Sequence, residues 1–405
     1  MRISTQSFFD QNLAAMSLQQ QKLFQVQQQI SAGTRLLTSA DDPLAAARAL
    51  GVSESMAQTV QYASSRGRAL QSLSLEESAL QSATSILQDI KTLAVQAGNG
   101  ALSDADRATL ATTLQSHFDQ LVSVANSDNG NGQFLLAGYK SANPPFARQA
   151  DGSMKYVGDQ GQHLMQVDVS RQMAATDDGR SIFQSVQGGA GYVSASAIGN
   201  TGSGVFGSTA VINVADSNYG KDFVISFPTP TTYRVDTATV PALAIVPDTA
   251  YTAGSPITFG GLQISISGAP AAGDTFKVAT ARNAGTDVFE AISDLVKALR
   301  KPLTGGGTAA QAQLLNALST ASNKITNAYD NVLTIRASVG SRMVELDALN
   351  TSGASRSLID QSYLSELQDL DYAKAISEFS QRETSLKATL QTFARLNSIA
   401  LFNYV

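Results

Sequence analysis

Proline is distributed very unevenly along the 405-residue chain, and this distribution limits the possible folds more than any other feature. Only Pro43 precedes Asn143, most of the others fall between Pro144 and Pro270, and Pro302 is the last. Both ends can therefore form long uninterrupted helices, whereas turn residues in the middle separate short runs that are typical of strands. The pattern predicts an α+β multidomain protein, with long coiled-coil or bundled helical arms from both termini and an inserted Pro/Gly-rich β domain.

An inserted domain carries the chain away from the first helical region and back again. The helices at the two termini are therefore expected to lie side by side. A break in the helical pattern near Ser352-Gly353 should separate the last arm from the helix before it. We expect terminal helical assembly arms forming an inner core at residues 1–42 and 355–405, a helical bundle shell at residues 43–138 and 285–354, and a β-rich outer domain at residues 139–284.

Each arm carries a stripe of apolar residues whose spacing alternates between three and four residues. Such a heptad stripe is typical of a coiled-coil seam, and it is too narrow for a helix buried deep in a globular core. The alternation of three- and four-residue steps continues without a slip in the C-terminal arm, and the match to a heptad pattern is weaker in the N-terminal arm. The expected assembly seam consists of Leu13, Met16, Leu23, Ile30, Tyr372, Ile376, Phe379, Leu386, Leu390, Phe393 and Ala400.

Polar residues interrupt both stripes at seam positions. Such residues reduce stability but can fix the register of a coiled coil or select its partner. The candidates for this role are Gln20, Gln27, Glu383 and Asn397. Periodicity alone leaves open that both arms are ordinary amphipathic helices packed on a local core.

Composition excludes several classes of function. The chain has no cysteine, so disulfides, thiolate metal sites and a cysteine nucleophile are absent. Its formal net charge of -5, without any basic run, argues against nucleic acid as a partner. The first thirty residues have no signal-peptide features, and no apolar stretch is long enough to span a membrane. We therefore expect no membrane span and, if the protein is exported, a route without a cleaved signal peptide.

Signals for catalysis are weak. The run from Gly202 to Gly207 matches GxGxxG, but no clear strand precedes it and no helix follows, which favours a loop over a dinucleotide site. The two histidines, His117 and His163, lie in different expected domains and cannot form a shared metal site or triad. No catalytic, cofactor-binding or metal-binding residue is predicted, and the chain is not expected to be an enzyme.

Several stretches resemble the flagellin superfamily and, within it, the hook-associated proteins of the hook–filament junction. They are Met1–Gln6, Gln29–Arg35, Ser39–Pro43, Ser74–Ser78, Asn99–Asp104 and Asn131–Tyr139. The family's signature between its first two helices is matched by Gly33, Arg35, Asp41, Asp42 and Pro43. The last residues, Ala400–Val405, are more similar to a junction protein than to a filament flagellin, which tends to end in a basic residue.

The resemblance implies a structural component of the bacterial flagellum that forms the junction between hook and filament. It implies a homo-oligomeric ring that contacts a preceding hook-associated protein and flagellin, and a cytoplasmic export chaperone that binds the C-terminal region. It also implies an extracellular location in the flagellum after type III export, with no cofactor. A filament flagellin is the alternative, and a non-flagellar coiled-coil adhesin or signalling module is a more remote one.

Overall fold

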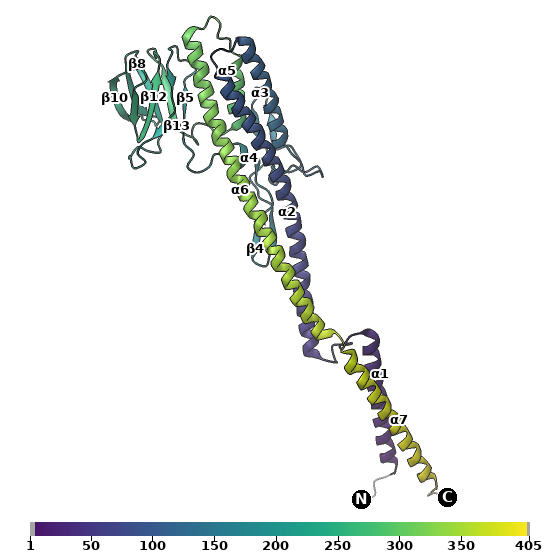
Figure 1. Ribbon diagram of the computed structural model, residues 1–405. Helices are drawn as coiled ribbons and strands as arrows, with labels where there is room; N and C mark the ends of the chain where they lie inside the picture. The colour runs from purple at the N-terminus through teal and green to yellow at the C-terminus, as the bar shows by residue number, and fades with distance from the viewer. Residues whose placement is uncertain (1–4, 403–405) are drawn as a thin grey trace. The chain divides into compact units, whose positions relative to one another are not determined.

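The computed structural model describes residues 5–402, and the side-chain surroundings of residues 10–395. Long helices occupy both ends of the chain and strands the middle (Figure 1), so the predicted α+β class is confirmed. Two compact units form, one from the described parts of residues 1–64 and 348–405 and the other from residues 65–347. The division into three domains expected from the sequence stays a prediction.

The first unit contains the two terminal helices, α1 (Thr5–Ala32) and α7 (Tyr372–Phe402), which lie side by side (Figure 1). It also contains the start of α2 (Pro43–Ala97) and the end of α6 (Gly307–Gln368). These two helix segments meet through small residues. Ala45 and Ala49 of α2 pack against Leu367 of α6, and all three are buried.

The expected helix break near Ser352-Gly353 is wrong, because α6 continues through this point to Gln368. A glycine inside a helix costs only about 1 kcal/mol relative to alanine, which packing can offset. The chain breaks instead at Asp369–Asp371. There the Asp371 carboxylate accepts the backbone N–H of Lys374 at 3.1 Å and so begins α7.

In the second unit, α3 (Asp104–Ala125) and α5 (Val288–Arg300) pack on each other beside the rest of α2 and α6. A capping box begins α3, since Ser103 and Asp106 bond each other's backbone N–H. The core of this helical part consists of fully buried apolar side chains, among them Leu73, Leu80, Leu87, Ile90, Leu114, Leu121, Phe289, Ile292 and Leu295.

Between α3 and the larger sheets the chain forms small elements. These are the hairpins β1 (Phe146–Arg148) with β2 (Met154–Tyr156) and β3 (Leu164–Asp168) with β4 (Arg171–Ala174), followed by the short helix α4 (Gly179–Phe183). The turn of the first hairpin contains Asp151-Gly152, a pair that favours tight hairpin turns. The apolar run Gln133–Tyr139 makes turns instead of a strand, and the Leu136 carbonyl accepts the Gly179 N–H at 2.8 Å.

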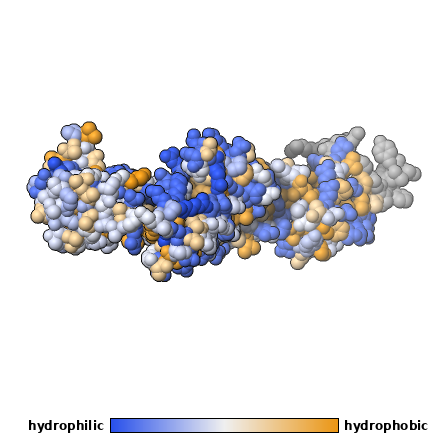
Figure 2. All heavy atoms as spheres, turned by 90° about the horizontal axis from the view of Figure 1, so that it is seen from above, coloured by the Kyte–Doolittle hydropathy of each residue, from blue (hydrophilic) through white to orange (hydrophobic). Residues whose placement is uncertain are grey.

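Residues 192–280 form two antiparallel sheets packed face to face on an aromatic core, which we call the β lobe. One sheet has the order β10-β9-β8-β13-β5, and the other has β11-β12-β6 with β7 also paired to β12. In Figure 2 the lobe, at the left, is mostly pale, the colour of intermediate hydropathy. Its strands are β5 (Tyr192–Ser196), β6 (Val205–Phe206), β7 (Ala210–Val211), β8 (Phe223–Thr229), β9 (Thr232–Thr237), β10 (Ala244–Ala250), β11 (Pro256–Phe259), β12 (Leu262–Ser267) and β13 (Thr275–Thr280).

The GxGxxG run, residues 202–207, follows β5 in the lobe, packs tightly and contains the two-residue strand β6. A Cβ atom at Gly202 would lie 2.3 Å from the backbone nitrogen of Ala271, and one at Gly204 would lie 3.0 Å from the ring of Phe276. The Asp274 carboxylate accepts the N–H groups of Thr201 and Gly202 at 2.8 and 3.0 Å. These glycines therefore allow close packing of the lobe, and the run is a loop except at the two residues of β6.

A charged cluster is buried where α2 and α6 hold the segment after β4. Glu76 is fully buried; one of its carboxylate oxygens accepts the Asp177 N–H at 3.1 Å, and the other has no hydrogen-bond partner. Arg342 of α6 pairs with the Asp177 carboxylate. Burial, with the nearby Asp177 charge, raises the pKa of Glu76 well above its usual range.

The variant Gly202→Ala should lower the free energy of unfolding of the lobe by about 1–3 kcal/mol, because the added methyl group overpacks the Ala271 backbone. Gly199→Ala is the control, since a Cβ there meets nothing within 4 Å. Chemical denaturation followed by intrinsic tyrosine fluorescence measures both. Equal stability of the two variants would contradict the packing role.

Replacing Glu76 with Gln should stabilise the protein more at pH 8 than at pH 5. A raised pKa in the folded state means that stability falls as the pH rises above the unfolded value, and glutamine removes this dependence. Denaturation of the wild type and E76Q at both pH values measures the difference. A pH-independent difference would show that Glu76 does not ionise on unfolding.

Candidate assembly site in the paired terminal helices

The surfaces of α1 and α7 that face each other follow a heptad spacing. In both helices a set of buried or partly buried positions alternates between steps of four and three residues, and Gln29, Glu378 and Glu383 are partly buried beside it. On α1 these positions are Asn12, Met16, Gln19, Leu23, Val26 and Ile30. On α7 they are Ala375, Phe379, Arg382, Leu386, Thr389 and Phe393. We call these twelve residues the intrachain seam.

Half of the seam expected from the sequence belongs to the intrachain seam. The shared residues are Met16, Leu23, Ile30, Phe379, Leu386 and Phe393. The other expected apolar residues lie beside this seam and are about half exposed: Leu13 (50%), Tyr372 (51%), Ile376 (53%) and Leu390 (41%). Ala400 and Asn397 fall outside the residues whose side chains the structure describes.

Two of these exposed residues, Ile376 and Leu390, form a second stripe on α7 together with the partly buried Glu383. Ile376, Glu383 and Leu390 are seven residues apart, and each directly follows an intrachain seam residue in the sequence. One residue corresponds to a rotation of about 100° around a helix, so this stripe lies on the flank of the pair. The apolar surface of α7 is therefore wider than the surface that α1 covers.

None of the four polar residues expected to set register lies in the described intrachain seam. Gln20 and Gln27 are exposed on α1, and Glu383 pairs with Lys387 one turn later at 2.6 Å. The polar residues that do lie in the seam on α7 are Thr389 and Arg382, and the Arg382 guanidinium pairs with Glu378. A search for apolar periodicity misses Arg382, as it misses Gln19 and Thr389, because these side chains are polar.

The two helices are joined at one end by a hydrogen-bonded elbow between two chain breaks. The Leu370 N–H donates to the Gly33 carbonyl at 3.1 Å, and the Arg35 N–H donates to the Gln368 carbonyl at 2.7 Å. Gly33 has a φ of 73°, and a Cβ there would lie 3.0 Å from the Tyr372 hydroxyl. Only glycine combines this backbone conformation with this close approach.

The other signature residues complete the elbow. The Arg35 guanidinium donates to the Leu367 carbonyl at 3.0 Å and pairs with Asp42 at 3.3 Å. Asp42 also accepts the Ala45 N–H at 3.0 Å and caps α2, which begins at Pro43. The structure therefore brings together all five residues of the signature, Gly33, Arg35, Asp41, Asp42 and Pro43.

Asp41 holds the turn between α1 and α2. Its carboxylate accepts the backbone N–H groups of Thr38 and Leu37 at 2.8 and 3.0 Å, and the side-chain amide of Gln25 at 2.7 Å. These hydrogen bonds, that of Thr38 above all, hold the pKa of Asp41 below its usual value. The pKa of Asp42 is lowered mainly by the bond from Ala45.

Other kinds of site have little support in the described part of the chain. Residues 5–402 contain no cluster of three acidic or histidine side chains that could hold a metal ion. Among the described helices, none has the length and apolar character needed to cross a membrane. The paired helices and their elbow are therefore the strongest candidate for a functional site.

Comparison with known proteins places this arrangement among flagellar proteins. Residues 3–141 match the family described as the bacterial flagellin N-terminal helical region. The chain is 29% identical to flagellar hook-associated protein 3 of Salmonella typhimurium, with 99% of each chain covered. It is 33% identical to a flagellin of Listeria monocytogenes, but only over 33% of this chain and 44% of the flagellin.

Solved structures agree with the sequence comparison. The crystal structure of FlgL from Xanthomonas campestris has a TM-score of 0.68 and 28% identity, covering 78% of this chain and 99% of that chain. The flagellar junction protein FlgL from Legionella pneumophila has a TM-score of 0.68 and 25% identity, covering 80% of this chain and all of that one.

The variant Asp41→Asn should remove an acid-sensitive part of the elbow. Because the pKa of Asp41 is lowered, its stabilising bonds are present above about pH 4 and are lost as the pH falls through the folded-state pKa. Amide hydrogen exchange at Leu37 and Thr38, corrected for the intrinsic pH effect, should therefore accelerate on acidification in the wild type and change less in D41N.

Asp10→Asn, at an exposed position of α1, is the matched control and should behave like the wild type. If D41N and the wild type show the same acid response, Asp41 does not hold the elbow.

Proposed function

The chain belongs to the flagellin superfamily and, within it, to the hook-associated proteins of the hook–filament junction, and we propose that its paired terminal helices assemble it there as a structural subunit. Two surfaces on one helix pair support this mechanism. The intrachain seam holds α1 and α7 together, and the second stripe on α7 stays exposed in the single chain. Neighbouring subunits would cover that stripe.

Burial of this second stripe between neighbouring subunits would contribute to the free energy of assembly. Burying a leucine or isoleucine side chain fully contributes roughly 1.5–3 kcal/mol, and Ile376 and Leu390 are each about half exposed. Contacts repeated around a closed ring add up, while a single chain gains nothing from the exposed stripe. The exposed stripe would therefore stabilise a subunit only when neighbouring subunits cover it.

The elbow would fix the direction in which the paired helices leave α2 and α6. Its hydrogen bonds join two chain segments more than 300 residues apart, such as Arg35 and Gln368. A ring needs every subunit to present its seam in the same orientation. The signature residues Gly33, Arg35, Asp41, Asp42 and Pro43 would serve this purpose.

The remaining partners follow from membership in the family and are part of the proposal. The ring would stack on a preceding hook-associated protein on one side and receive flagellin on the other. A cytoplasmic export chaperone would bind the C-terminal region before type III export, when the apolar stripes of α7 are not covered. The assembled protein would lie outside the cell, with Gln20, Gln27, Glu383 and Asn397 available to select neighbours.

A filament flagellin is the alternative function. The similarity to a flagellin covers only a third of this chain, whereas the similarity to hook-associated protein 3 covers nearly all of it, the β-rich middle included. The full-length match therefore favours the junction role, which is structural and not enzymatic.

The double variant Ile376→Ser/Leu390→Ser tests the second stripe. Because both residues are half exposed in the single chain, the variant should keep the wild-type helix content and unfolding midpoint. In a strain that lacks the native protein, it should reduce swimming in soft agar at least tenfold and fail to retain filaments on hooks. Electron microscopy counts the filaments.

Val240→Ser, at a fully exposed position of the β lobe, is the control and should swim normally. Normal swimming and full filament numbers in the double variant would refute a role of this stripe in assembly.

A further inference from the structure

The β lobe is attached to α6 by one row of polar side chains. Gln313, Asn316 and Thr320 lie on one face of α6, three and four residues apart. Gln313 donates to the Asn200 carbonyl at 2.8 Å, and Thr320 donates to the Ser194 carbonyl at 2.8 Å. All three side chains reach backbone atoms of the lobe, so the attachment does not depend on the lobe's own side chains.

Asn316 is the centre of this row. It is buried, its Nδ2 donates to the Gly204 carbonyl at 2.9 Å, and its Oδ1 accepts the Phe206 N–H at 3.1 Å. The amide thus continues the hydrogen bonding of β6 as a neighbouring strand would. A row of hydrogen bonds along a single line resists sliding of the lobe but resists rotation about that line much less.

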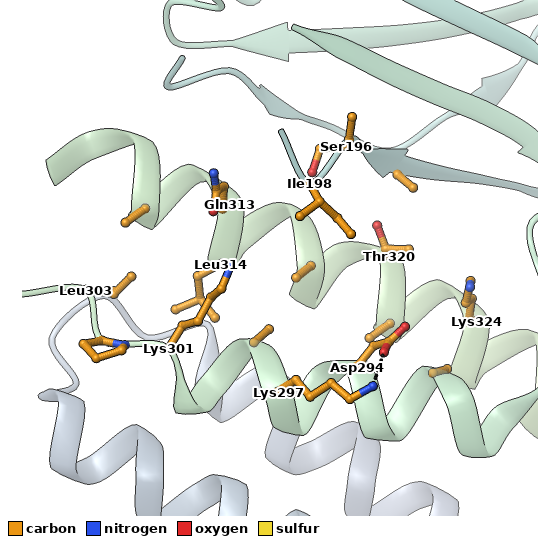
Figure 3. Close-up of a pocket in the computed structure, with 18 residues that line it drawn as sticks. Ser196, Ile198, Asp294, Lys297, Lys301, Leu303, Gln313, Leu314, Thr320 and Lys324 are labelled. Atoms are coloured by element: carbon orange, nitrogen blue, oxygen red, sulfur yellow. Dashed lines mark hydrogen bonds and ion pairs between the residues drawn. The ribbon is translucent and has the colours of Figure 1, made fainter. Parts of the chain in front are cut away.

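An open groove lies beside the row, between the end of β5 and the helices α5 and α6 (Figure 3). Its volume is about 700 Å³, and seven of its lining residues are alanines. Short side chains leave room for a larger apolar group to enter. Figure 3 shows Ile198 of the lobe pointing toward α6 across this space, and its side chain is 91% exposed.

We propose that the β lobe rotates about the polar row of α6. In one orientation the lobe closes over the groove, and the Ile198 side chain enters it. Closure would bury an apolar side chain that water now surrounds, against alanines that are themselves part of the groove. Opening would expose the groove together with Lys301 and Lys324 on its lining. The lobe can therefore take two tilts while the helical core keeps its packing.

Spin labels can measure these two tilts, because the chain contains no cysteine of its own. Val240→Cys in the lobe and Val95→Cys on α2 are both strongly exposed and lie in the same unit. Double electron–electron resonance on the full-length protein should show two distance populations. Adding Ile198→Asp should deplete one of them at least threefold, because a carboxylate cannot enter the apolar groove.

The pivot is tested in the same labelled background with Asn316→Ala, which should broaden the distribution. A label pair within the lobe, Val240→Cys with Val211→Cys, should give one narrow distance in every background and shows that the lobe remains folded. A single narrow distance between Val240 and Val95, or two populations whose ratio Ile198→Asp does not change, would overturn the hinge.

Discussion

The pairing of α1 with α7 determines how the rest of this protein can work, because it uses only part of the apolar surface that the two helices carry. Phe379, Leu386 and Phe393 face α1, while Ile376 and Leu390 lie on the flank of the pair. A single helix of this length is marginally stable in water, so the intrachain contact gives α7 its form. The flanking stripe then becomes a surface of defined geometry for a neighbour.

The elbow gives the paired helices the same orientation, relative to the adjoining ends of α2 and α6, in every subunit. Two backbone–backbone bonds, such as Leu370 N–H to the Gly33 carbonyl, join its two chain segments, and charged side chains add further bonds to them. Exposed ion pairs such as Arg35–Asp42 add little stability on their own. This ion pair instead helps to orient the two helices. Arg35 also donates to the Leu367 carbonyl, so a single side chain connects the start of α2 with the end of α6.

Much of this architecture is predictable from the sequence, for reasons visible in particular residues. Leu262–Ser267 alternates apolar and polar residues, as does most of Thr275–Thr280, and the two segments form β12 and β13. The strands β6 and β7 have two residues each, which is too short to show the alternation of apolar and polar residues that predicts a strand. The true break before α7 contains neither glycine nor proline; it depends on the elbow's tertiary hydrogen bonds, which the local sequence does not reveal. Likewise, Arg382 and Thr389 enter the intrachain seam through their position, although their polarity hides them.

Assembly through α7 requires that its flank is free in the subunit and covered in the flagellum. Cysteine placed singly at Leu390 or at Leu386, in a chain with no other thiol, reports this directly through its rate of maleimide labelling. Cys at position 390 should react with maleimide rapidly in the isolated protein and at least tenfold more slowly in flagella. Cys at position 386 should react slowly in both. Equally rapid labelling of position 390 in flagella would contradict assembly through α7.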